Sequence, residues 1–265
     1  MQSLIKYALV TGASGGIGRE FALRLASEGW AIVLVGRNEA KLLAVKAALS
    51  GANAAASEVV VCDLSVPGAA ERLHATCAGK GLAVELLVNN AGSGVFGESL
   101  ESSPAGVEAM VNLNVSALTI LCALFGREMK ARGSGRVLNV GSFAGLNATP
   151  YFAAYAATKS YVLNYTLALR AELRGSGVVV TCLLPGYVRT DFDDNAGVKS
   201  AAYKRFSSAN GLGPEEVAAV GLAALEDGKA FAIAGARNRI AAFLFGLLPR
   251  TAPPAIMKSF LDRLV

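Results

Sequence analysis

A short apolar run, Tyr7 to Thr11, leads directly into a glycine-rich turn and then into an amphipathic stretch that closes at Gly29. A strand, a glycine turn and a helix in this order place backbone N–H groups and the start of a helix against a phosphate. Gly12 allows the sharp turn, Gly16 lets the backbone approach a ligand, and Gly18 lets the helix pack closely on the strand. The sequence therefore predicts an α/β chain that opens with a phosphate-binding loop.

Further apolar runs alternate with helix-like stretches along the whole chain. We expect strands at 31–36, 59–63, 86–88, 136–140, 178–184 and 231–234, with helices between them. With 53% hydrophobic and 17% charged residues, many side chains must be buried, which suits a parallel sheet covered on both faces. The 265 residues suffice for one sizeable core, and the alternation never breaks. The expected fold is a single-domain, doubly wound parallel sheet of about seven strands over residues 1–265.

A second stretch, Ser142 to Lys159, carries candidate chemistry. Tyr155 and Lys159 stand four apart in an Ala-rich run that predicts a helix, so the phenol and the ammonium lie on one face. A neighbouring cation favours the phenolate, so we expect the pKa of Tyr155 to fall from ~10 toward neutral. Ser142 follows an apolar run. If Tyr155 protonates the carbonyl group of a substrate, the Ser142 hydroxyl is placed to hydrogen-bond that carbonyl. Tyr–Lys pairs at this spacing also arise by chance on amphipathic helices. The rest of the chain decides between a functional pair and a chance pair.

Composition argues against several other classes of protein. The formal charge of +5 is modest and unclustered, so nucleic acid ranks last among the partners. The four cysteines show no metal-ligand or redox spacing, and no metal is expected. The single histidine, His74, has no ligand-type partner nearby in the sequence, which excludes a histidine triad or zinc site. The N-terminus reads as entering a strand without a signal segment, and no stretch of ~20 uncharged apolar residues occurs.

The turn reads Thr-Gly-Ala-Ser-Gly-Gly-Ile-Gly, with Gly-x-x-x-Gly-x-Gly spacing in place of Gly-x-Gly-x-x-Gly. This resembles the signature of the short-chain dehydrogenase/reductase (SDR) family, a TGxxxGxG/YxxxK pattern. Later motifs agree in order and spacing: Asn89 to Gly92 after the fourth strand, Ser142 thirteen residues before Tyr155, and Pro185 to Thr190. The match spans roughly Tyr7 to Asp191, and the resemblance implies a Rossmann-like fold.

The resemblance also implies a catalytic set. Ser142 would hydrogen-bond the carbonyl oxygen, Tyr155 would act as general acid and base, and Lys159 would lower the phenol's pKa and bond the nicotinamide ribose. Asn114 would hold a water that completes a proton relay through Lys159. Asn112 competes for that role, but Asn114, with Ala117 three residues on, fits the family's Asn-x-x-Gly better.

The end of the second strand bears on the cofactor. An acid there would bind the ribose 2′-hydroxyl of NAD, but the sequence has Gly36 followed by Arg37, which suits a 2′-phosphate. We therefore expect NADP, with NADPH preferred over NADH; an Arg solvated at a helix start is the alternative. The expected cofactor-binding residues are Gly12, Ser14, Gly15, Gly16, Ile17, Gly18, Arg37, Asp63, Leu64, Asn90, Ala91, Gly92, Tyr155, Lys159, Pro185, Gly186, Val188 and Thr190.

By this resemblance the chain is expected to be an NADP-dependent carbonyl reductase. It would interconvert a carbonyl and a primary or secondary alcohol on a small hydrophobic substrate. The alternative is a catalytically inactive dinucleotide-binding regulatory protein, which would not need Ser142, Tyr155 and Lys159 together. We expect a cytoplasmic homo-oligomer, a dimer or a tetramer.

Two C-terminal segments carry no family signature. The polar residues 192–212 are expected to form a mobile lid over the substrate. The apolar tail, 237–265, is expected to cover the pocket, to contact a second subunit or to lie on a membrane through its flanking arginines. Its run of about ten apolar residues is too short to span a bilayer.

Overall fold

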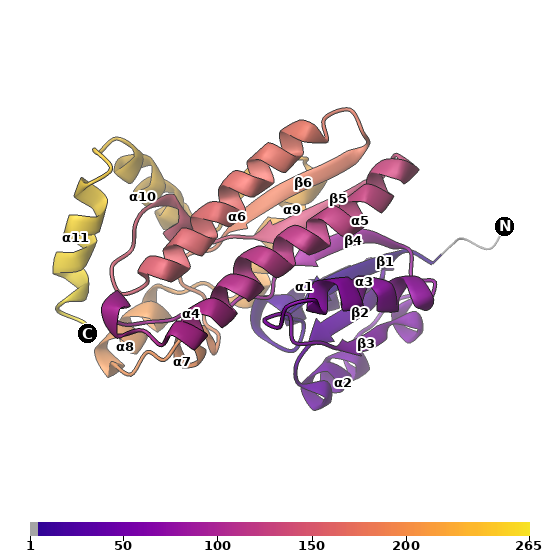
Figure 1. The fold of residues 1–265 in the computed structure, drawn as a ribbon, viewed down its shortest axis with the longest axis horizontal. Coiled ribbons are helices and arrows are strands. Elements are labelled where there is room, and N and C mark those ends of the chain that lie inside the picture. Colours follow the sequence, from indigo (N-terminus) through magenta and orange to yellow (C-terminus); the bar gives the residue numbers. More distant parts are fainter. Residues whose placement is uncertain (1–4) are drawn as a thin grey trace.

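The computed structural model describes residues 5–265, which form a seven-stranded parallel sheet with helices on both faces (Figure 1). The expectation of a chain that begins without a signal segment falls partly on residues 1–4, which lie outside the described residues. The strands are β1 (Tyr7–Thr11), β2 (Ala31–Gly36), β3 (Glu58–Val61), β4 (Val84–Asn89), β5 (Gly135–Val140), β6 (Val178–Leu184) and β7 (Phe231–Ile233). The predicted fold class is confirmed.

The strands follow the order β3-β2-β1-β4-β5-β6-β7, and all neighbouring pairs are parallel. The chain builds outward from β1 in one direction and then returns to add β4 on its other side. In such sheets ligands bind outside the carboxyl ends of the strands, at the point where the order reverses. The ends of β1 and β4 carry the glycine turn and the Asn90-Ala91-Gly92 segment, so this edge positions the candidate site.

Helices cover the sheet in two layers because the strand side chains are apolar on both sides. Leu9, Val33 and Val137 face α3, α5 and α6 in one core, whereas Val10, Ile32 and Leu138 face α1, α2 and α9 in the other. All six of these side chains are fully buried. The covering helices are α1 (Gly16–Ser27), α2 (Glu39–Ala47), α3 (Ala69–Gly79), α5 (Leu118–Arg132), α6 (Ala153–Glu172) and α9 (Pro214–Glu226).

The remaining helices lie at the carboxyl edge of the sheet or beyond it. They are α4 (Pro104–Val111), α7 (Phe192–Asn195), α8 (Ala201–Asn210), α10 (Ala236–Gly246) and α11 (Ala252–Leu261). Figure 1 shows α10 and α11 at one end of the molecule, on the other side of α5 and α6 from β1. The segment 192–212 holds two helices, and its Val198 and Tyr203 are buried. Its mobility stays a prediction.

One helical stretch in the described residues, Pro104–Arg132, is long and apolar enough to cross a membrane by length and composition alone. Its α5 part is a core helix of the sheet. Leu118, Leu121 and Phe125 are buried against the strands. Burial in the protein accounts for the apolar character of the α5 part.

Candidate active site

Ser142 is delivered by the carboxyl end of β5. The Gly141 N–H donates to the Leu183 carbonyl, and the Phe143 N–H donates to the Pro185 carbonyl over 2.7 Å, so the residues on either side of Ser142 are tied to the end of β6. The Ser142 hydroxyl oxygen accepts a hydrogen bond from the Ala144 N–H at 3.1 Å. Because the oxygen is the acceptor there, the hydroxyl hydrogen is left to be donated to another oxygen.

Tyr155 and Lys159 lie one turn apart on α6, as the spacing predicts, and both are buried. The Lys159 Nζ lies 5.8 Å from the centre of the Tyr155 ring and donates to the Val140 carbonyl at 2.8 Å. Val140 precedes Ser142 by two residues, so this bond ties the lysine to the strand that carries the serine. The three candidate groups are therefore held by one helix and one strand end.

The pKa of Tyr155 differs from the sequence-based expectation. Burial raises it to about 12, the Ser142 hydroxyl acts in the opposite direction, and the charge of Asp193 raises it further. The expected fall was wrong in this structure because enclosure of the phenol penalises the phenolate more than its neighbours favour it. Tyr155 is thus held in its neutral, proton-donating form.

Burial also shifts the pKa of Lys159, but downward, because it penalises the charged form of a cation. Removal from water lowers its pKa from 10.5 to about 8, and the nearby Cys182 acts slightly in the other direction. Burial also raises the pKa of the Cys182 thiol to about 11. At neutral pH the site therefore holds one buried ammonium beside neutral hydroxyl and thiol groups.

Asn114 lies in a π-helical turn, Asn112–Ala117, between α4 and α5. Its amide oxygen accepts from the Ser93 N–H, and its amide nitrogen donates to the Ser93 carbonyl and to the Thr158 hydroxyl. Thr158 precedes Lys159, so Asn114 links the loop after β4 to the helix of the Tyr–Lys pair. Asn114 is buried, whereas Asn112 is only partly buried, in line with the preference for Asn114. Single π-helical turns are frequent at functional sites.

The glycine turn has the shape that a phosphate group needs. Gly12 and Gly16 adopt positive φ of 66° and 52°, and a Cβ on Gly18 would lie 2.2 Å from the Gly12 carbonyl oxygen. Gly15 caps α1 without a side-chain hydrogen bond, and nothing lies within 4 Å of a Cβ built on it. The first N–H groups of α1, that of Ile17 included, are therefore available to an anion, and Ser14 lies just before them. The residues present fit the pyrophosphate of a dinucleotide.

The segment after β4 braces this turn. The Asn90 amide donates to the Thr11 carbonyl at 2.9 Å, and the Thr11 hydroxyl accepts from the N–H groups of Asn90 and Ala91. A Cβ on Gly92 would lie 3.2 Å from the Lys159 Nζ and 3.3 Å from the Asn114 amide oxygen. A larger residue at position 92 would crowd both side chains, which explains why a glycine is found there.

The segment after β6 closes the site on the other side. A Cβ on Gly16 would lie 3.0 Å from the Thr190 methyl group, so Thr190 sits beside the glycine turn. Pro185 is tied to the turn after Ser142, Gly186 is packed against the Asn238 side chain, and Val188 forms a parallel bridge with Leu212.

Arg37 and Asp63 follow the neighbouring strands β2 and β3. Burial would raise the pKa of Asp63, but two hydrogen bonds from Ser65 and the charge of Arg37 outweigh it, so the pKa lies below its usual value. Arg37 is exposed, and a Cβ on Gly36 would lie 3.6 Å from the Ser14 hydroxyl. A residue 36 without a carboxylate, with a hydroxyl and a guanidinium beside it, fits a 2′-phosphate. Leu64 is buried next to Asp63.

Sequence reasoning missed an aromatic cluster around Tyr155. Its ring centre lies 5.5 Å from that of Phe152 and 5.3 Å from that of Phe192, and Phe96 and Tyr203 complete the cluster. The rings come from the loop after β4, from α6 and its N-terminal flank, from α7 and from α8. In the sequence, the one indication of this cluster is that Phe192 and Tyr203 lie within the otherwise polar segment 192–212.

The contact of Tyr151 with the C-terminal helix α11 is another feature that the sequence did not reveal. Tyr151 is the one non-glycine residue in the described chain with positive φ, 63°, and it directly precedes Phe152. Its hydroxyl donates to Asp262 at 2.5 Å and accepts from Lys258 at 2.9 Å, and Lys258 and Asp262 also pair with each other. Leu261 of α11 is buried in the aromatic cluster. The C-terminal helix α11 therefore packs against the aromatic cluster around Tyr155.

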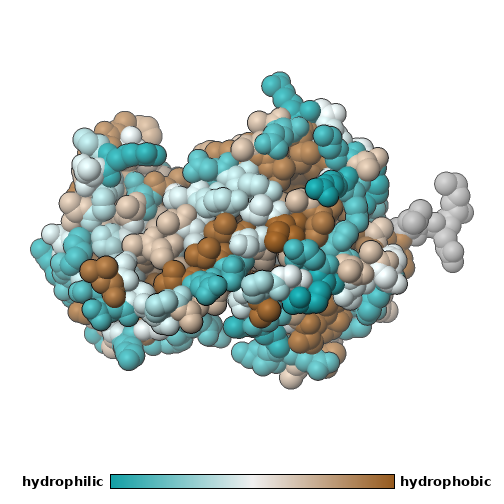
Figure 2. Space-filling model, viewed as in Figure 1, coloured by the Kyte–Doolittle hydropathy of each residue, from teal (hydrophilic) through white to brown (hydrophobic). Residues whose placement is uncertain are grey.

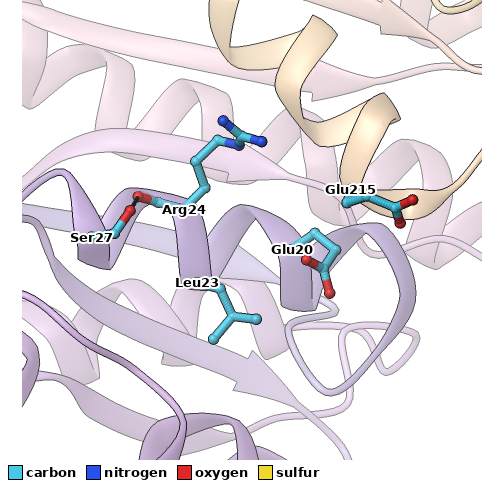
Figure 3. A pocket seen from close by; sticks show the side chains of 5 residues that line it. All are labelled: Glu20, Leu23, Arg24, Ser27 and Glu215. Carbon is cyan, nitrogen blue, oxygen red and sulfur yellow. Dashed lines mark hydrogen bonds between the residues drawn. The ribbon is translucent and has the colours of Figure 1, made fainter.

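A separate depression lies on the outer side of α1 and α9 (Figure 3). It is lined by Glu20, Leu23, Arg24, Ser27 and Glu215, and the Ser27 hydroxyl donates to the Arg24 carbonyl. None of the candidate catalytic or cofactor residues lines it.

Comparison with known proteins agrees with these motifs. The family model described as short chain dehydrogenase matches residues 6–200. The very-long-chain 3-oxoacyl-CoA reductase-B of Danio rerio is 31% identical over 192 residues, which cover 71% of this chain and 61% of that protein. The galactitol 2-dehydrogenase (L-tagatose-forming) of Cereibacter sphaeroides is 34% identical over 222 residues, covering 81% and 85%. The chain thus spans about three fifths of the length of the first of these relatives.

Solved structures show the same fold. A 7beta-hydroxysteroid dehydrogenase superposes with a TM-score of 0.85 at 27% identity, covering 96% of each chain. A short-chain dehydrogenase from Sphingobium yanoikuyae in complex with NADPH gives a TM-score of 0.79 at 28% identity, covering 94% of this chain and 97% of the other. With the family model matching most of its length, the chain belongs to the short-chain dehydrogenase/reductase family of oxidoreductases.

Proposed function

We propose that the protein is an NADP(H)-dependent oxidoreductase that interconverts a carbonyl and an alcohol on a hydrophobic substrate. One observation carries the proposal: Ser142, Tyr155, Lys159 and Asn114 are all buried and are bonded to the same few elements at the carboxyl edge of the sheet. The glycine turn lies at that edge as well. Nothing in this intact set favours the alternative of an inactive regulatory protein.

The proposed roles follow from the geometry of each residue. When bound, the nicotinamide cofactor supplies hydride transfer to or from the carbonyl carbon. Ser142 donates its free hydroxyl hydrogen to the carbonyl oxygen, where negative charge develops during reduction. Tyr155 gives that oxygen its proton, and its high pKa of about 12 keeps the proton available at neutral pH. In alcohol oxidation the phenolate form of Tyr155 takes the proton back.

Lys159 and Asn114 support this proton transfer. The buried ammonium of Lys159 offsets the phenolate that forms when Tyr155 gives up its proton, which lowers the cost of that charge. We further propose that Lys159 bonds the nicotinamide ribose and that Asn114 holds a water connected to it. Asn114 is suited to this because its side chain is fixed by Ser93 and Thr158 and lies against Gly92, close to the Lys159 Nζ.

The preference for NADPH over NADH is proposed from the end of β2. NADP complexes occur among the structural neighbours. In this chain Arg37 and Ser14 offer donors for a 2′-phosphate, and Gly36 offers no carboxylate that would repel it. A preference for NADPH favours reduction in a cell, where that cofactor is held mostly reduced.

The aromatic cluster supports a hydrophobic substrate. Phe152, Phe192 and Tyr203 surround the phenol that is proposed to reach the carbonyl, and Leu261 closes the cluster from α11. The named relatives that act on long acyl chains and on steroids agree with this choice, whereas the galactitol dehydrogenase acts on a sugar alcohol. We propose that residues 192–212 form the lid over this substrate and that α11 forms its outer wall, within a single domain.

The apolar tail and the helices beside the site bear on location and assembly. We propose a cytoplasmic enzyme with peripheral membrane contact through residues 237–265. For assembly we propose a homo-oligomer, a dimer or tetramer, that pairs through the helices of Asn114 and Tyr155. Figure 2 supports this pairing, because hydrophobic residues gather along the middle of the face where Figure 1 draws α5 and α6.

The test is the oxidation of NADPH, followed by its absorbance, across a panel of carbonyl compounds that includes steroid ketones, 3-oxoacyl thioesters and small aldehydes. The proposal expects NADPH oxidation with at least one hydrophobic carbonyl and a matched amount of alcohol product. NADPH that binds but is not oxidised with any member of the panel would favour the regulatory alternative.

A further inference from the structure

Helix α10 carries apolar side chains on the outside of the protein. Ile240, Phe243 and Leu244 lie on α10, and Leu247 and Leu248 directly follow its last residue, Gly246; the five continue one helical spacing, and we call them the α10 face. Their exposed fractions range from 39% to 68%, and no residue of α10 is buried. Single exposed apolar residues are ordinary, whereas five gathered on one helix and the turn that follows it mark a contact surface.

The charge around this face is of one sign. Between Asp227 and Asp262 the sequence has five cations and no carboxylate, but Lys229 pairs with Asp227, so the cations that matter here are the arginines of this segment. Arg237, Arg239 and Arg250 are exposed and border the α10 face in sequence. The next carboxylate, Asp262, is already paired with Lys258. The surface is therefore apolar in the middle, and the positive charge of the three arginines at its margins is not compensated by a carboxylate in the described residues.

The charge decides between the partners that could cover an apolar helix face. A second copy of this chain would bring two sets of these arginines against each other, which disfavours pairing. An anionic lipid surface accepts both the apolar side chains and the cations. We infer that the α10 face inserts into the headgroup region of a membrane leaflet rich in anionic lipid, with Arg237, Arg239 and Arg250 against the lipid phosphates.

The position of α10 connects this contact with the site. The helix packs beside the turn Phe143–Leu146, which follows Ser142, and its Asn238 packs against Gly186. Because an α-helix with its side chains is ~10–12 Å across, the lipid surface lies about one helix diameter from that turn. Resting on the proposed function, the inference adds that a hydrophobic carbonyl compound dissolved in the leaflet enters the site past α10 and α11.

Vesicle flotation with the full chain tests the membrane contact. The protein should float with vesicles that mix phosphatidylcholine and phosphatidylglycerol, and at least tenfold less with pure phosphatidylcholine. The double variant Phe243→Ser/Leu247→Ser should lose at least tenfold of the bound fraction on the anionic vesicles. Leu43→Ser, which removes an exposed apolar residue on α2, is the matched control and should bind as the wild type does.

Charge and depth are tested by two further sets of variants. Arg237→Glu/Arg239→Glu should lose binding to anionic vesicles while its weak binding to neutral ones stays the same. In a Trp30→Phe background, which removes the single tryptophan, Phe243→Trp should be quenched by brominated lipid and Leu43→Trp should not.

The inference is overturned if the wild type does not float with anionic vesicles, or if the serine double variant floats equally well. It is also overturned if that variant changes from dimer to monomer while the wild type ignores vesicles, which would identify a second copy as the occupant. Flotation without NADPH oxidation on any carbonyl compound would leave the lipid contact standing and refute the proposed function. Normal turnover of a water-soluble carbonyl compound without flotation would support the proposed function and refute the lipid contact.

Discussion

Lys159 carries a positive charge inside the protein, and replacing it with methionine should stabilise the fold at neutral pH. The drop in its pKa from 10.5 to about 8 corresponds to a cost of about 3 kcal/mol for the buried charge at pH 7. Lys159→Met removes this cost but leaves the Val140 carbonyl without its donor, which costs about 1–3 kcal/mol. The net gain expected at pH 7 is about 1 kcal/mol.

The pH dependence separates the charge from these other effects. The folded state holds Lys159 with a lowered pKa, so between pH 8 and 10.5 the unfolded chain binds the proton more strongly and wild-type stability rises with pH. At pH 9.5 the cost of the charge has fallen to about 1 kcal/mol. The variant's stability relative to the wild type should therefore fall by about 2 kcal/mol from pH 7 to pH 9.5, from a gain of about 1 kcal/mol to a loss of about 1 kcal/mol. The neighbouring Cys182, with a pKa of about 11, stays mostly neutral over this range.

The assay is equilibrium unfolding in urea, followed by far-ultraviolet circular dichroism without cofactor at pH 7 and pH 9.5. Lys41→Met, at an exposed position on α2, is the control and should show the same small difference at both pH values. A Lys159→Met difference that is equal at the two pH values would refute the reasoning, because a lost contact alone does not titrate. The variant should also lose carbonyl reduction by several orders of magnitude, a trade of activity for stability.

Three further predictions follow from other parts of the site. Arg37→Ala should raise the KM for NADPH at least tenfold and leave that for NADH nearly unchanged; equal losses in steady-state kinetics would remove the phosphate role. Gly18→Ala should lower the urea midpoint and abolish NADPH binding, because its Cβ would lie 2.2 Å from the Gly12 carbonyl oxygen, whereas Gly15→Ala meets no atom within 4 Å and should fold normally. Asp262→Asn removes the carboxylate that holds Tyr151, so limited proteolysis should cut the 247–251 linker several times faster, with the thermal midpoint little changed; an unchanged cleavage rate would mean that α11 is held by Leu261 alone.

The sequence could predict the parts of the site that depend on local spacing. The glycine turn follows from the bend between β1 and α1, and the Tyr155–Lys159 pair follows from helical periodicity. Strand periodicity located the sheet as well, although β3 ends at Val61, two residues before the expected end, and leaves Asp63 in the loop. The position of Ser142 beside them rests on the pairing of β5 with β6, which apolar runs indicate but do not register.

The remainder depends on contacts between distant residues. The pKa of Tyr155 rises because Phe192 and its neighbours enclose the phenol, and no spacing around Tyr155 reports that enclosure. Tyr151 and Asp262 are 111 positions apart, so their contact could not be read from the sequence. The tail was recognised as apolar, but only the fold separates its two helices, with Leu261 of α11 packed inward and the α10 face left outward.

The central claim is that Tyr155 transfers the proton during carbonyl reduction, and Tyr155→Phe tests it most directly. The variant keeps the ring that packs against Phe152 and Phe192 but lacks the hydroxyl, so it should fold and bind NADPH as the wild type does. Single-turnover reduction should then fall at least 100-fold, within the range expected for loss of a general acid. A variant that binds NADPH normally and still reduces the carbonyl at close to the wild-type rate would contradict the account.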